Sequence, residues 1–323
     1  MHCNSGGSGY PVINYLVTMF ATLDTLVELP RKDPPPVPAR VPADTARDIK
    51  KRAVRVAKTK KLIWPLIDLH SPIENQYWNS YYCSRNLKQE GQYLTSKYCN
   101  TRWCFECNAI RAAKMINGYK PVFEQWPGVQ FVTLTRPNVP GKQLLSEVED
   151  LVHTFELCRR YLRERKSKPV RGLRKLEVTY NSRTKTFHPH FHLIVEDLMQ
   201  AKLVIAEWLY RNPTASPEAQ HIRKADEGSY LEMFKYATKS VVNKHTPAIA
   251  LDLIFQSIQG KRIYQPFGIE KKVSEDVTEI ERQAYGMLEP SVYKVWYFDD
   301  AAEDWRSLNG ELLTNAVQTF NTS

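Results

Sequence analysis

The middle of the chain alternates between two spacings of apolar residues. Residues 129–135 (VQFVTLT) are rich in β-branched side chains and predict a strand. In residues 144–162 apolar side chains recur every three or four positions, which predicts an amphipathic helix that buries Cys158. Both spacings recur downstream, in the order strand, helix, strand, strand, helix, strand, helix, over residues 129–135, 144–162, 173–180, 188–195, 198–210, 219–224 and 230–241.

This order of elements predicts an α+β fold of the split βαβ, ferredoxin-like type. The turn Asn181-Ser182-Arg183 favours an antiparallel hairpin between the second and third strands. We expect helices to cover one face of the antiparallel sheet and the other face to be open for a ligand. A further helix is expected over residues 247–258, with Thr246 as its N-cap.

The chain as a whole suggests five segments, and those that flank the main domain are less regular. Residues 1–43 are expected to form a poorly ordered extension with a proline-rich linker at 34–38. The remaining segments are a basic helical segment, a cysteine-rich subdomain, the main α+β domain and a C-terminal extension without a readable motif, at residues 44–82, 83–125, 126–270 and 271–323.

Composition and charge point to a polyanionic partner. The 323 residues are 42% hydrophobic, which is enough for a substantial core, and carry a formal net charge of +10. Much of this charge lies in residues 47–61, where Lys51, Arg52 and Arg55 are candidate contacts to a nucleic-acid backbone. The apolar residues 10–29 are interrupted by polar ones and lack a basic leader, so neither a membrane span nor a signal peptide is expected.

Four clustered cysteines predict a structural zinc site in a reducing, cytoplasmic environment. Cys104 and Cys107 form a C-x-x-C pair, which supplies two of the four ligands that tetrahedral Zn²⁺ needs. Cys99 and Cys83 are the other two candidates, although His70 could replace the more distant Cys83. Positive charge beside this cluster would suit a nucleic-acid grip, and it comes from Arg102, Arg111 and Lys114.

The segment His188-Pro189-His190-Phe191-His192 suggests a second metal site. Alternation along a strand puts His190 and His192 on one face, where two imidazoles can bind a divalent ion. Glu177 lies on the paired strand and would complete a site of mixed nitrogen and oxygen ligands, which suits Mg²⁺ or Mn²⁺. The alternative is a solvated strand face that happens to carry polar residues.

The expected helix 230–241 carries a third group of candidate residues. Glu232, Tyr236 and Lys239 are spaced four and three apart, so a continuous helix would present them on one face. A tyrosine can attack a phosphodiester, a lysine can neutralise developing charge, and a carboxylate can activate water. A solvated face with a Glu–Lys pair is the ordinary alternative.

Together these motifs resemble those of the HUH endonucleases, and more narrowly the rolling-circle replication initiators of bacterial plasmids. Residues 131–135 resemble the first motif of that family, residues 176–192 its metal-binding region and residues 232–239 its nucleophile helix. The run from Cys99 to Cys107, followed by Arg111, is similar to the cysteine-rich stretch that precedes the first motif in many members. The similarity covers about residues 83–268.

The resemblance implies an enzyme that nicks one strand of origin DNA in the cytoplasm of a bacterial host. Tyr236 would be esterified to the 5′-phosphate and leave a 3′-OH for a host polymerase, and Glu232 would serve the closing hydrolysis. No Walker-type phosphate loop appears, so a helicase would come from the host. The alternatives are an HUH transposase or mobilisation relaxase, or a zinc-containing DNA-binding regulator with an inert site. The oligomeric state stays open.

Overall fold

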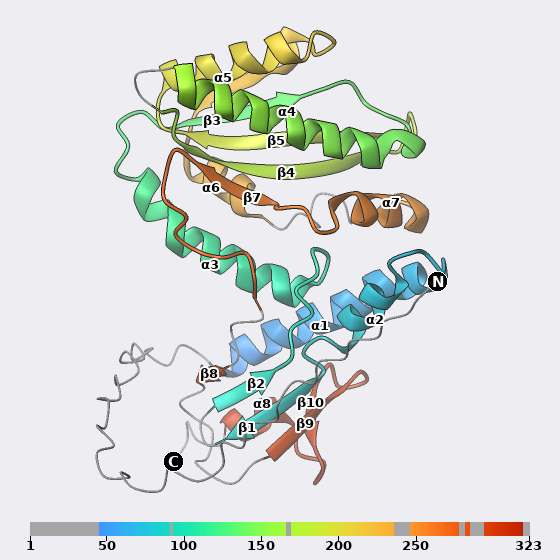
Figure 1. Ribbon diagram of the computed structural model, residues 1–323. Coiled ribbons are helices and arrows are strands. Elements are labelled where there is room, and N and C mark those ends of the chain that lie inside the picture. Colours follow the sequence, from blue (N-terminus) through green and yellow to red (C-terminus); the bar gives the residue numbers. More distant parts are fainter. Residues whose placement is uncertain are drawn as a thin grey trace, which may run out of the picture. The chain divides into compact units, whose positions relative to one another are not determined.

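Figure 1 shows the computed structural model of the chain. It describes residues 45–90, 93–165, 169–235, 246–277, 282–284 and 294–318. The expected N-terminal extension, residues 1–43, lies outside these ranges. The α+β fold class expected from the sequence is confirmed, with two antiparallel sheets among the described residues.

The main sheet has the strand order β6-β3-β5-β4-β7, and every neighbouring pair is antiparallel. The strands are β3 (Gln130–Thr135), β4 (Gly172–Asn181), β5 (Thr186–Val195), β6 (His221–Lys224) and β7 (Tyr264–Phe267). Because β5 runs antiparallel to both β3 and β4, these two strands are parallel to each other with β5 between them. This is the split βαβ arrangement, extended at one edge by β7.

Helices α4 (Leu144–Arg165) and α5 (Leu198–Arg211) cover one face of this sheet (Figure 1). The apolar side of each helix, read from its three-and-four spacing, meets the apolar side of β5. Phe191 of β5 packs against Phe155 of α4 and Trp208 of α5, with ring centroids 5.2 and 5.9 Å apart. Cys158 is buried in this core, as its position on the apolar face of α4 predicts.

The opposite face of the sheet is only partly open, because helices cover part of it, which the sequence-based expectation did not include. Helix α6 (Glu227–Phe234) packs against β5 and also contacts α3 (Phe105–Phe123). Met233 and Phe234 of α6 are buried in the main core. The sequence predicted a helix here but not the surface on which its apolar residues pack. That surface is this face of the sheet.

Helix α6 is also shorter at its C-terminal end than the sequence predicts. It begins in a capping box in which Asp226 accepts from the Ser229 backbone at 2.7 Å. It ends at Phe234, because Lys235 has an extended backbone with ψ of 150°. The prediction of one continuous helix through Lys235 is therefore wrong, and residues 236–241, with Tyr236 and Lys239, lie outside the described residues.

The second sheet joins residues from both ends of the described chain. Its order is β10-β9-β1-β2-β8, and its strands are β1 (Asn86–Glu90), β2 (Tyr93–Ser96), β8 (Arg282–Ala284), β9 (Lys294–Asp299) and β10 (Asp304–Ser307). Helices α1 (Thr45–Ile67) and α8 (Leu313–Gln318) pack on it, and Leu87, Trp296 and Trp305 are fully buried there. The division into five segments stays a prediction, but residues 294–318 clearly share a core with α1.

Two further helices, α2 (Glu74–Tyr82) and α7 (Ala248–Ile258), contact one another through a buried hydrogen bond. The Tyr77 hydroxyl donates to Asp252 at 2.5 Å, and nearby the rings of Trp103 and Phe255 stack with centroids 5.0 Å apart. The N-cap of α7 is Pro247 rather than Thr246. Among the described residues, no helix is long and apolar enough to cross a membrane.

Candidate active site and zinc centre

The register of β4 and β5 brings the three expected ligands of the first metal site together. Glu177 lies directly opposite His190, and His192 is two residues further on the same face. The Nε2 atoms of the two histidines are 3.2 Å apart, and His192 Nε2 is 3.4 Å from Glu177 Oε2. One ligand atom from each residue lies within 4.8 Å of the others, which is compact enough for a single ion.

The hydrogen bonds behind the histidines orient them for metal binding. His190 Nδ1 donates to the carbonyl oxygen of His188 at 3.0 Å, so its Nε2 carries the lone pair. His192 Nδ1 is 3.2 Å from the Thr133 hydroxyl, which can fix the same tautomer. Burial lowers the pKa of His190 to about 4, which keeps the ring neutral as a ligand must be. These residues therefore fit a divalent ion.

Glu232 reaches this site from the last turn of α6. Its Oε1 atom is 3.8 Å from His192 Nε2, and it also forms an ion pair with Lys235. The carboxylate therefore lies beside the expected metal ligands, partly exposed to solvent. Glu232 thus lies at the site although α6 ends at Phe234. The expectation that one continuous helix presents Glu232, Tyr236 and Lys239 on one face is not needed to place it there.

Two lysines of the site were missed from the sequence. Lys175 is fully buried in β4, and burial lowers the pKa of its ammonium group. Its Nζ atom lies 3.2 Å from Glu177 Oε2 and 3.0 Å from the carbonyl oxygen of Glu232. Alternation along β4 places Lys175 on the face of Glu177, and this signal could have identified it. Nothing in the spacing singled out Lys235.

The four cysteines also come together. Cys83 follows α2, Cys104 is the N-cap of α3, and Cys107 lies in the first turn of that helix. The Cys107 sulfur is 3.6 Å from those of both Cys83 and Cys99. In a tetrahedron with Zn–S bonds of about 2.3 Å, neighbouring sulfurs are roughly 3.8 Å apart. The cluster therefore fits zinc with little rearrangement.

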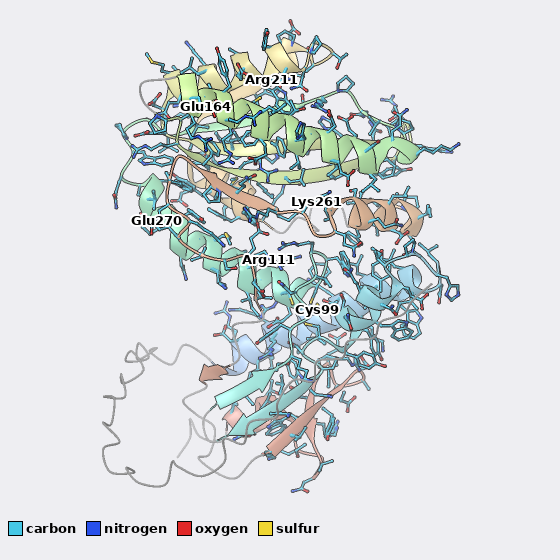
Figure 2. The ribbon with its side chains drawn as sticks, viewed as in Figure 1. Cys99, Arg111, Glu164, Arg211, Lys261 and Glu270 are labelled. Atoms are coloured by element: carbon cyan, nitrogen blue, oxygen red, sulfur yellow. The ribbon has the colours of Figure 1, made fainter. Side chains whose placement is uncertain are left out.

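The surroundings of the cluster support the same conclusion. All five cysteines among the described residues are free thiols. The sulfurs act on one another: against the effect of burial, hydrogen bonds from the other three lower the pKa of the Cys99 thiol, and hydrogen bonds from Cys107, Cys83 and Cys99 raise the pKa of Cys104. His70, the alternative fourth ligand, has a side chain that is 81% exposed and pairs with Glu74 at 3.1 Å. Figure 2 shows Cys99 close to the end of α3 that carries Arg111.

The six candidate DNA-binding cations differ in their exposure, and two of them are too buried to contact DNA. Arg52 and Arg111 are each only 2% exposed. Arg52 Nε is 3.3 Å from Glu106, and Arg111 donates to the Asn100 carbonyl at 3.1 Å. Their assignment as DNA contacts is therefore corrected: they bind buried acceptors that the sequence pattern does not reveal.

The other four candidates retain some exposure. Lys51 is exposed on a concave surface of α1 that also includes Lys50 and Lys58. Arg55 borders the same surface while its Nε donates to Glu106 at 2.6 Å. Arg102 pairs with Glu275 at 2.8 Å, and Lys114 donates to the Asp276 carbonyl at 2.6 Å. Among the candidate DNA-binding residues, those on the α1 surface are thus the most accessible.

Comparison with known proteins gives an independent result. A family model described as "Replication protein" matches residues 91–199. This range includes Glu177, both metal-site histidines and three of the four clustered cysteines. "Protein rep" of Streptococcus pneumoniae serotype 2 (strain D39 / NCTC 7466) is 32% identical over 105 residues, covering 30% of this chain and 32% of that protein. "Protein rep" of Staphylococcus aureus is 27% identical over 188 residues, covering 51% of this chain and 80% of that protein.

The resemblance to plasmid rolling-circle replication initiators is confirmed. The chain spans about a third of the length of the streptococcal "Protein rep" and four fifths of the staphylococcal one. The family match ends at residue 199, before Glu232 and Tyr236, so the assignments on α6 and beyond rest on the motif and on geometry. No solved structure matches this chain.

Proposed function

We propose that this protein is a metal-dependent, origin-specific DNA nicking and joining enzyme that starts rolling-circle replication of a plasmid or small phage. The observation that carries this proposal is the convergence of His190, His192 and Glu177, with the Glu232 carboxylate beside them. An inert DNA-binding regulator would have no need for two oriented imidazoles next to two carboxylates.

The first step is a transesterification. A divalent ion at His190, His192 and Glu177 would withdraw charge from the scissile phosphate. The Tyr236 hydroxyl attacks phosphorus, and the bond from phosphorus to the 3′-oxygen of the DNA breaks. The tyrosine proton leaves to solvent and the released 3′-oxygen is protonated, so the products are a 5′-phosphotyrosine and a free 3′-OH. Lys239 neutralises the charge that develops on the phosphate.

The closing step is hydrolysis of the phosphotyrosine. Glu232 takes a proton from water, the water oxygen bonds to phosphorus, the bond to the Tyr236 oxygen breaks, and the released Tyr236 oxygen takes up a proton from solvent. The position of the Glu232 carboxylate, 3.8 Å from His192 Nε2, supports this role because such a water would lie beside the phosphate held at the ligands.

The rest of the molecule would support binding and folding. A structural Zn²⁺ at Cys83, Cys99, Cys104 and Cys107 would join the end of α2 to the start of α3. The exposed lysines of α1 would contact the DNA backbone without sequence preference. Unwinding and synthesis would fall to a helicase and a polymerase of the host.

A nicking assay on single-stranded origin oligonucleotides tests the proposal. We expect Mg²⁺- or Mn²⁺-stimulated cleavage and a covalent protein–DNA adduct on a denaturing gel. The variant His190→Ala should lose both, whereas His153→Ala, an exposed histidine on α4, should keep them. If the wild-type protein binds origin DNA but never cleaves it in any divalent metal, the inert-regulator alternative is correct.

A further inference from the structure

Lys175 occupies a position where a charge is costly. It lies in the middle of β4, paired with His192 on one side and Tyr264 on the other, and its side chain has no exposed surface. Removing an ammonium group from water costs several kcal/mol, by order of magnitude, and an apolar residue often serves packing as well or better. Packing alone therefore does not explain a lysine at this position.

One contact of Lys175 is with a candidate metal ligand. Its Nζ atom is 3.2 Å from Glu177 Oε2, the oxygen that also lies 3.4 Å from His192 Nε2. A lysine donor on this oxygen restricts the rotation of the carboxylate. Glu177 is thereby held with its oxygen toward the histidines.

The other contact is with the end of α6. Nζ is 3.0 Å from the carbonyl oxygen of Glu232, which lies in the last turn of the helix. Carbonyl groups in a last turn lack the partners that a continuing helix would supply, and a cation there also interacts favourably with the helix dipole. Lys175 thus caps α6 from the sheet, and the capped residue is the one whose side chain reaches the site.

We propose that Lys175 is a positioning residue for the hydrolytic step: it fixes the backbone of Glu232 relative to the metal ligand Glu177, so that the Glu232 carboxylate stays beside the phosphate. This inference deepens the proposed function and rests on it. Lys175 itself touches neither the DNA nor the reacting atoms. The other charged or titratable groups around it are Glu232, Lys235, His192 and Tyr264.

The test compares Lys175→Met, which removes both donated bonds, with Lys175→Gln, whose amide can still donate. Release of the adduct, measured as turnover after the first nick, should fall about tenfold or more in Lys175→Met, the size expected for loss of a hydrogen bond from a charged group. Lys175→Gln should recover part of this loss. KM for the oligonucleotide and the amplitude of the first nick should change much less than turnover.

A matched control comes from the neighbouring residue. Arg174 is equally buried but lies on the opposite face, 4.6 Å from the centroid of the Phe191 ring. Arg174→Met should lower thermal stability while leaving the ratio of adduct release to nicking unchanged. If Arg174→Met and Lys175→Met change that ratio equally, Lys175 has only a structural role and the inference is wrong.

Two measurements that do not require activity separate this inference from the proposed function. Mn²⁺ binding, measured by titration calorimetry, should persist in Lys175→Met and Lys175→Gln. Amide hydrogen exchange in residues 229–235 should become faster in Lys175→Met and be partly restored in Lys175→Gln. Unchanged exchange would overturn the inference even if the wild-type protein nicks, whereas absence of nicking by the wild type would overturn only the proposed function and the hydrolytic role that rests on it.

Discussion

Replacing Cys107 by serine would remove one sulfur of the four-cysteine cluster, the candidate zinc site. Cys107 is fully buried and lies 3.6 Å from two of the other thiols, so no water can take over its place as a ligand without opening the cluster. Zinc binding contributes about 10–16 kcal/mol to folding of small four-ligand domains. Divided among four ligands, this is about 2.5–4 kcal/mol for one thiolate.

This loss should be visible as a lower melting temperature. With an unfolding entropy of about 2.1 cal/mol/K per residue, 1 kcal/mol corresponds to about 1.5 °C for a chain of 323 residues, so Cys107→Ser should melt about 4–6 °C below the wild type. The effect should be concentrated near the cluster, because Cys83, Cys104 and Cys107 form a small apolar cluster with Val277 that is separate from the main core. Exchange in the main sheet should change little.

The assay combines calorimetric melting with zinc analysis of the purified protein. Cys158→Ala is the matched control, since Cys158 is a buried thiol of the main core whose pKa burial raises to about 12. It should keep one zinc per chain and lose only the stability of a small core truncation. A full complement of zinc in Cys107→Ser, with a melting temperature within 2 °C of the wild type, would refute the reasoning.

Further outcomes follow from the site and from α1. His190→Ala should reduce nicking at least about 100-fold while origin binding, measured by anisotropy, stays within a few-fold, because only the metal site is lost. Lys50→Gln with Lys58→Gln should reduce the slope of log affinity against log salt by about two for every DNA sequence, and an effect confined to origin DNA would contradict this. Tyr236→Phe should form no covalent adduct on a denaturing gel. Glu232→Ala should form the adduct and release it slowly, so normal turnover in that variant would exclude the hydrolytic role.

Four of the five strands of the main sheet could be predicted because their signals are local, whereas the edge strand β7 was missed. The hairpin of β4 and β5 has strong alternation on both sides of a turn, and the spacing of β-branched and polar residues placed Glu177, His190 and His192 on one face. Since the side chains of a strand alternate strictly, a correct register was enough to assemble the ligands.

The end of α6 could not be predicted, because its cause is tertiary. Neither glycine nor proline interrupts residues 230–241, and apolar residues continue at helical spacing. In the structure Phe234 packs near Tyr264, and Lys175 binds the carbonyl of Glu232. These contacts come from strands far away in the sequence, and they compete with continuation of the helix.

The second sheet was missed for a related reason, while Arg52 was misread despite a usable signal. The strands β1 and β9 pair across about two hundred residues, and both are short and partly charged. Arg52, by contrast, falls between Ile49, Ala53 and Val56 on the apolar side of α1. Helical spacing alone would have placed it inside, and only its partner Glu106 was beyond prediction.

The pairing of β1 with β9 has a consequence for the order in which the chain can fold during synthesis. The strands of the main sheet all lie between residues 130 and 267, so that sheet can form before the C-terminal region leaves the ribosome. Leu87 and the apolar side of α1 must wait for Trp296 and Trp305 to cover them. A nascent chain therefore exposes this apolar surface until residues 294–307 emerge, and a fragment that stops near residue 270 would expose it permanently.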